Sequence, residues 1–167
     1  TSTITVAATN DAPVLTLDSD NSSTAGGGDY QATYNEGTAR IPVVDTTDSI
    51  LSDVDSAGFT SMSVTISGAQ DGADEILTIV SNTYALNANT SDNLTTDTVL
   101  IDVEYTSGNG RFNFTKNGGG ELTTATVNIL IDAIRYENTN ANPTSGARTI
   151  VFVVNDGAAL STARTST

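Results

Sequence analysis

The sequence predicts an all-β fold: an antiparallel β-sandwich that contains one short helix. The chain is rich in Thr, Val, Ile, Asn and Gly, residues that are typical of strands and of the turns between them. Apolar and polar residues alternate in short runs, and clusters of Asn, Asp, Gly and Ser separate these runs. At 167 residues, the chain is long enough to form one domain with a hydrophobic core.

The alternating runs give the expected strands in order along the chain. We expect strands at 13–18, 30–34, 39–44, 59–68, 76–81, 98–105, 110–115, 134–138, 148–154 and 160–166. Turn-forming residues separate several of them, as at 117–120 and 155–157. Polar residues dominate segments 19–29 and 82–97, so we expect the first to be a loop and the second to be a polar insertion.

One segment departs from the alternation of a strand. Its apolar residues Val127, Leu130, Ile131 and Ile134 recur at the spacing of one helix face. Thr123 or Thr124 precedes them, and threonine is a favourable residue at a helix N-cap. The pattern therefore predicts a short helix over about 123–133.

The composition suggests one domain preceded by a short extension. No break in composition divides residues 10–167, which we interpret as a single sandwich domain. Residues 1–9 alternate like a strand and then run into Asn-Asp-Ala-Pro. The chain both starts and ends with Thr-Ser-Thr, which suggests a repeat junction seen twice. We therefore interpret residues 1–9 as the tail strand and linker of a preceding repeat.

The residues that are absent, and the charge, exclude several classes of function. The chain has no Cys, His or Trp, which excludes a Ser-His-Asp triad, a cysteine nucleophile and a histidine-based zinc site. The chain has twenty acidic and six basic residues, which gives a net charge of −14. This charge disfavours nucleic acids and membrane insertion as partners, and it attracts hard cations such as calcium. The alternative is that the acidity serves only solubility.

Strand alternation sorts many of the acidic residues to the two ends of the sandwich. If neighbouring strands are antiparallel, the linker, the Ser-Asp-Val-Asp loop and the Asn-Asp-Gly turn meet at one end. Their candidate metal ligands are Asn10, Asp11, Asp53, Asp55, Asn155 and Asp156. The other end receives Glu36, Asp71, Asp74 and Glu75.

Each group of acids would repel itself without a bound cation. Calcium accepts six to eight oxygen ligands in irregular cages, whereas magnesium needs a near-ideal octahedron. Each segment alone is equally compatible with a solvated turn. Because three segments converge on one end, we predict calcium there, with the other end as a second candidate.

The motifs also resemble a known family as a set and in order. They are Asn-Asp-Ala-Pro-Val-Leu at 10–15, Tyr-Asn-Glu-Gly at 34–37, Ile-Leu-Ser-Asp-Val-Asp at 50–55, Arg-Tyr-Glu-Asn at 135–138 and Val-Asn-Asp-Gly at 154–157. Over about 10–166, the chain resembles the cadherin-like tandem repeats of giant bacterial RTX adhesins. The resemblance implies an immunoglobulin- or cadherin-like sandwich and export to the cell surface by type I secretion. The chain itself lacks the calcium-binding nonapeptide pattern of a β-roll.

The resemblance further implies calcium between consecutive repeats. Glu36 of one repeat would share an ion with ligands of the next repeat, matched here by Asn10, Asp11, Asp53, Asp55 and Asp156. We therefore expect a calcium-rigidified extender module of a surface adhesin for biofilm or host attachment, with neighbouring repeats as partners.

Two other classes of function fit fewer of these observations. A carbohydrate-binding or homophilic recognition module is the main alternative, with Tyr84 as its best candidate for an exposed aromatic residue. A two-carboxylate glycosidase is disfavoured because aromatic platforms are scarce and the acids lie at the ends. We expect no enzymatic activity.

Overall fold

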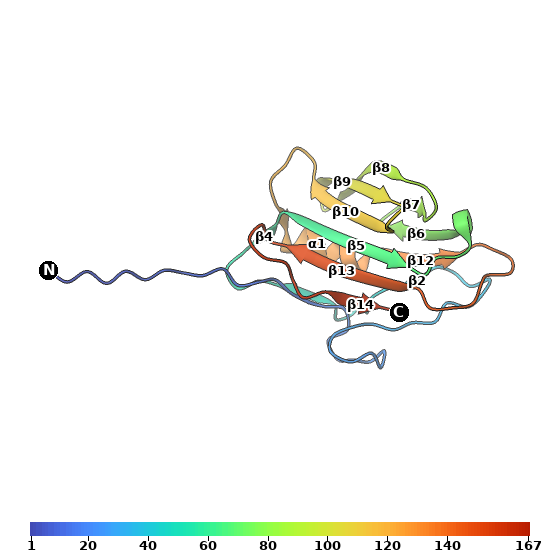
Figure 1. Cartoon of the computed structure of the whole chain (residues 1–167), viewed down its shortest axis with the longest axis horizontal. Helices are drawn as coiled ribbons and strands as arrows, with labels where there is room; N and C mark the ends of the chain where they lie inside the picture. The colour runs from blue at the N-terminus through green and yellow to red at the C-terminus, as the bar shows by residue number, and fades with distance from the viewer.

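The computed structural model describes residues 1–167 as an all-β sandwich with one short helix, as predicted (Figure 1). Its larger sheet has six strands in the order β14-β13-β5-β10-β9-β8. They span Arg164–Ser166, Thr149–Asn155, Ser61–Ser67, Arg111–Lys116, Val99–Thr106 and Thr90–Thr96. The smaller sheet has the order β2-β12-β6-β7, formed by Ile41–Pro42, Ile134–Asn138, Glu75–Ile79 and Asn82–Ala85.

Two short antiparallel strand pairs accompany the two sheets, and both contain a strand that contacts the helix. β1 (Val14–Thr16) pairs antiparallel with β3 (Ile50–Ser52), and β4 (Gly58–Phe59) pairs antiparallel with β11 (Leu122–Thr123). A single 3₁₀ turn, η1 (Gly72–Asp74), precedes β6. All strand pairs within the named sheets are antiparallel.

The core lies between the two sheets. Strands β5 and β13 alternate buried and partly exposed residues along most of their length, because successive side chains of a strand point to opposite faces. Tyr84 of β7 meets Phe112 of β10 edge to face, with ring centroids 5.5 Å apart. Phe112 also stacks on Tyr105 at 4.1 Å. Aromatic packing therefore joins the smaller sheet to the larger one.

The predicted helix is confirmed as α1 (Thr124–Asp132). The hydroxyl of Thr123 caps it by accepting a hydrogen bond from the Thr126 amide at 3.1 Å. Val127, Leu130 and Ile131 are buried against the core. The helix is too short to cross a membrane, and no other helix of the chain could do so.

Three predictions from the sequence were wrong. Segment 30–34 forms no regular strand, although Tyr30 makes a parallel bridge to Ser166. The segment 82–97 contains strands β7 and β8, so it is part of both sheets. Tyr84 within it is only 2% exposed and belongs to the core, which removes it as a surface platform.

Residues 1–9 form an extended arm that projects away from the sandwich (Figure 1). They have no secondary structure and make no backbone hydrogen bond with the rest of the chain. Their apolar residues Ile4 and Val6 are 88% and 89% exposed. The arm thus presents an alternating apolar face that nothing covers.

Gly110 lies in a tight turn before β10, and its substitution tests the packing of that turn. It has a φ of +66°, and a Cβ there would collide with the Ile66 carbonyl oxygen. We expect Gly110→Ala to lower the free energy of unfolding by about 1–3 kcal/mol in urea titrations. Gly108 has open space around it, so Gly108→Ala is the matched control and should be nearly neutral. Equal effects of the two substitutions would contradict this account.

Candidate metal sites

The first candidate site is the linker-end cluster, formed by Asn10, Asp11, Asp53, Asp55 and Asp156. The Asn10 side-chain amide donates to Asp156 Oδ2 at 2.9 Å. The Asp11 backbone amide donates to Asp55 Oδ2 at 3.1 Å. Residues far apart in sequence therefore meet at one end of the sandwich, as strand alternation predicts. The carboxylates of Asp11, Asp53, Asp55 and Asp156 do not, however, gather as closely around one point as the four acids of the lateral cluster below.

Turn geometry fixes the carboxylates of this cluster. Asp53 Oδ1 accepts hydrogen bonds from the Asp55 and Ser56 amides, both at 3.1 Å. Asp156 Oδ1 accepts two more, from the amides of Ala158 and Ala159. Hydrogen bonds from Ala159, Asn10 and Ala158 lower the pKa of Asp156, so it is ionised at neutral pH.

Asn155 has a different role from its neighbour. Its side-chain oxygen accepts a hydrogen bond from the Gly157 amide at 2.8 Å, which shapes the Asn-Asp-Gly turn. Its backbone oxygen accepts from the Thr60 amide. Both oxygens serve the turn and the adjacent chain, so we leave Asn155 out of the cluster.

At the opposite end, the acids are paired with an arginine. Arg148 forms salt bridges with Glu75 at 2.5 Å and with Asp71 at 3.4 Å. The Tyr136 hydroxyl and the amides of Gln70 and Asp71 also donate to the fully buried Glu75. The expected repulsion between these acids is therefore relieved by Arg148, and their oxygens have partners without a metal ion.

The pKa values agree with a structural role for this group. Burial alone would raise the pKa of Glu75, but hydrogen bonds from Tyr136, Asp71, Arg148 and Gln70 outweigh it and lower the pKa. Hydrogen bonds from Thr144 and Asn138 lower the pKa of Asp71. We therefore do not include Asp71 or Glu75 in a proposed metal site.

The two remaining acids of that end are exposed. Asp74 contributes its backbone oxygen to the Thr139 amide at 2.8 Å, while its side chain faces solvent. Glu36 lies in the exposed turn after Tyr34 and borders a surface groove that is also lined by Tyr136 and Arg148. Neither residue is gathered with other acids within this chain.

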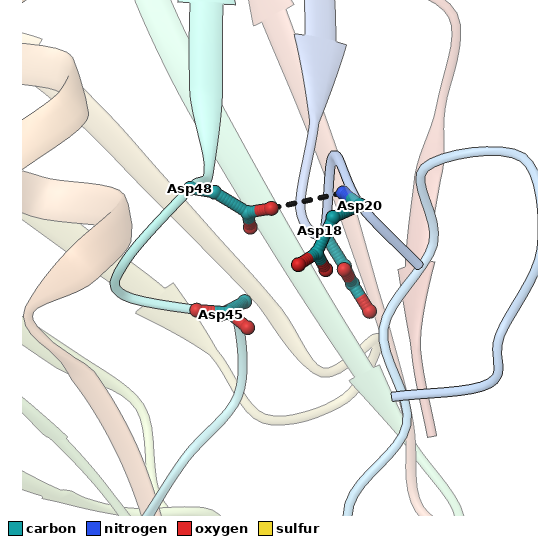
Figure 2. A group of neighbouring side chains, drawn as sticks. All are labelled: Asp18, Asp20, Asp45 and Asp48. Carbon is teal, nitrogen blue, oxygen red and sulfur yellow. Dashed lines mark hydrogen bonds between the residues drawn. The ribbon is translucent and has the colours of Figure 1, made fainter. Parts of the chain in front are cut away.

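A second group of acids was not predicted from the sequence. This lateral cluster is formed by Asp18, Asp20, Asp45 and Asp48 (Figure 2). Each residue offers a carboxylate oxygen, and these four oxygens lie within 4.8 Å of one another. Calcium holds oxygen at about 2.3–2.6 Å, so ligands on opposite sides of one ion lie about 5 Å apart. The spacing of the four oxygens therefore fits a single calcium ion.

The lateral cluster concentrates negative charge without a cation from the protein. Asp18 is fully buried and accepts hydrogen bonds from the amides of Ser22 and Ser23, at 3.0 and 2.8 Å. Hydrogen bonds from Ser23 lower its pKa against the opposing effect of burial. Hydrogen bonds from Thr47 lower the pKa of Asp45. All salt bridges of the chain involve Arg148, so this charge has no basic partner.

One further observation links the two clusters. Only two buried side-chain polar atoms of the chain lack a hydrogen-bond partner, Asp48 Oδ1 and Asp53 Oδ2. One lies in the lateral cluster and the other in the linker-end cluster. An unpaired buried polar atom costs about 1–3 kcal/mol, and more if it is charged. A cation in each cluster would give both oxygens a partner.

One feature of the sequence could have indicated the lateral cluster. Asp18 and Asp20 are separated by one residue, the same spacing as Asp53 and Asp55. No strand is predicted between 44 and 59, so Asp45 and Asp48 would be expected in the same linker-end loop as Asp53 and Asp55. Strand β3 instead carries the chain between the two clusters, so that Asp45 and Asp48 lie beside the end of β1.

A search for similar proteins found no protein family, curated protein or solved structure that matches the chain.

Proposed function

We propose that the chain is a calcium-binding module of a bacterial surface adhesin, a repeat that calcium stiffens into an extender. The observation that carries the proposal is the pair of unpaired buried carboxylate oxygens, one in each acidic cluster. Oxygen-only ligands, the high negative charge and the lack of His and Cys favour calcium over transition metals. The motif resemblance supplies the adhesin context.

Each cluster would stabilise a different part of the module. An ion in the lateral cluster would join the loop after β1 to the loop before β3, which already meet through the Asp20 amide and Asp48 Oδ2 at 2.9 Å. An ion at the linker end would fix the entering chain at Asn10 and Asp11 against the sandwich. Loss of calcium would restore repulsion and free the linker.

Thermal unfolding with and without calcium tests the proposal. A ligand at one hundred times its Kd stabilises a protein by about 2.7 kcal/mol. For a chain of this length we expect millimolar calcium to raise the Tm by roughly 5–10 °C over the value in chelator. Magnesium at the same concentration should produce a much smaller rise, since these irregular sites suit it poorly.

The comparison of the two cations is the control for ionic strength. Equal effects of calcium and magnesium would indicate charge screening. Identical melting curves in calcium and chelator would sink the proposal and leave the acidity as a means of solubility.

A further inference from the structure

The chain contains two Asn-Gly steps, Asn109-Gly110 and Asn117-Gly118, which lie just before and just after β10. In such a step the backbone nitrogen of the glycine can attack the side-chain carbonyl carbon of the asparagine. Ammonia leaves, a five-membered succinimide forms, and water opens the ring to aspartate or isoaspartate. Glycine favours the attack because no Cβ hinders the backbone rotation that it needs. The two steps share this chemistry, but the fold holds them differently.

The Asn109-Gly110 step is fixed in its turn. The Gly110 amide donates to the Ser107 oxygen at 3.3 Å, and the Gly110 oxygen accepts from the Ile66 amide at 2.8 Å. Gly110 is also buried, and the space beside its Cα is filled by the Ile66 oxygen. The nitrogen that would attack is therefore engaged, and it cannot turn toward the Asn109 side chain without the loss of these contacts.

The Asn117-Gly118 step is free to rotate. It begins the loop after β10, which arches away from the sandwich (Figure 1). The Gly118 amide donates to no group of the chain, and nothing lies within 4 Å of the position that a Cβ would take on Gly118 or Gly119. A single hydrogen bond, from the Gly119 amide to the Lys116 oxygen at 3.0 Å, closes the turn. Its nitrogen can therefore approach the Asn117 side chain at little cost.

The two asparagines also use opposite ends of their side-chain amides. Asn109 Oδ1 accepts a hydrogen bond from the Arg111 amide at 3.1 Å, and its nitrogen has no partner. Asn117 Nδ2 instead donates to Asp102 Oδ1 at 2.7 Å, and its oxygen has no partner. Deamidation replaces the nitrogen with an oxygen. It would preserve the contact of Asn109, whereas at Asn117 it would place two carboxylates against each other.

We propose that Asn117 is a modification site, at which the folded chain deamidates spontaneously with water as the only co-reactant. The new carboxylate is repelled by Asp102, so the reaction weakens the attachment of the loop after β10 to β9. That attachment otherwise includes the hydrogen bond from the Asn117 amide to the Leu100 oxygen at 3.0 Å. The inference goes beyond the proposed function and does not depend on calcium.

The test follows deamidation of the full chain at mildly alkaline pH, where the reaction is faster because the deprotonated amide nitrogen is the nucleophile. Cleavage after Arg111 separates the two asparagines, and mass spectrometry measures aspartate and isoaspartate at each. We expect Asn117 to convert at least about tenfold faster than Asn109, which corresponds to about 1.4 kcal/mol in activation free energy. The chain unfolded in urea is the control and should lose this difference, because neither glycine is then held. Equal rates in the folded chain, or faster conversion of Asn109, would overturn the inference.

Melting curves in chelator test the effect of the modification. Asn117→Asp reproduces the aspartate product and should lower the Tm by about 2–4 °C. The matched control Asn109→Asp adds the same charge but keeps its hydrogen bond with the Arg111 amide, so its Tm should stay nearly unchanged. Asp102→Asn/Asn117→Asp exchanges amide and carboxylate, which restores a hydrogen bond between them, and should recover the lost stability. Equal Tm values for the two single variants, or no recovery in the exchanged one, would contradict the proposed effect.

Discussion

Arg148→Met is expected to lower the free energy of unfolding by about 3–5 kcal/mol at neutral pH. The guanidinium is the basic partner of Glu75, which is fully buried, and of Asp71. Removing it leaves a buried carboxylate without its counter-charge, which costs far more than the pair contributes by its presence. Equilibrium unfolding in urea measures the change.

The pH dependence distinguishes this cause from a loss of packing. In the parent chain the pKa of Glu75 is lowered, so its stabilisation is present above the ordinary glutamate pKa and is lost as the pH falls through the lowered value. Without Arg148, burial should raise that pKa, so acidification protonates Glu75 and removes the penalty. The difference between the two chains should therefore narrow between pH 7 and about pH 4.

A second substitution supplies the control. Glu75→Gln/Arg148→Met removes both charges and should recover much of the stability lost in Arg148→Met, because no unpaired ion remains. If the double variant is as unstable as the single one at every pH, the contribution of Arg148 is its packing and not its charge.

Asp20→Asn/Asp48→Asn is expected to remove most of the calcium-dependent rise in Tm. The substitutions delete two of the four charges of the lateral cluster. In chelator the same variant should melt at a slightly higher temperature than the parent, because like charges no longer face one another. Calcium titrations followed by differential scanning calorimetry measure both effects.

Asp97→Asn/Glu104→Gln is the matched control, since it removes two exposed acids outside both clusters. It should retain the full calcium response. A lateral-cluster variant that responds to calcium like the parent would place the stabilising ion elsewhere, with the linker-end cluster as the remaining candidate. Loss of the response in both variants would indicate general screening of the net charge.

Much of the fold could be predicted because local pattern and burial agree. The runs at 61–67 and 149–155 alternate clearly, and both strands lie in the middle of the larger sheet. Strands β7 and β8 were missed because their inward residues are few, chiefly Tyr84, Leu94 and Thr96. Such strands form because they can hydrogen-bond to the exposed edge of a neighbouring strand. The residues of the segment itself do not reveal that edge.

The candidate sites also differ in how far they could be predicted from the sequence. The linker-end cluster followed from strand direction alone, since reversing chains return to the same end. The pairing of Arg148 with Asp71 could not be read locally, because 77 positions separate the two residues. The lateral cluster depends on β3, a strand of three residues whose apolar pattern is too short to identify.

The position of β14 bears on how the domain would respond to force. β14 lies between β13 and the segment at Tyr30, and the entering linker is held at the far end of β13. Tension between the linker and Thr167 would therefore act along the strand axis. The hydrogen bonds on both sides of β14 would then be loaded together in shear, and not opened one after another like a zipper. This arrangement is suited to a domain that carries a sustained load.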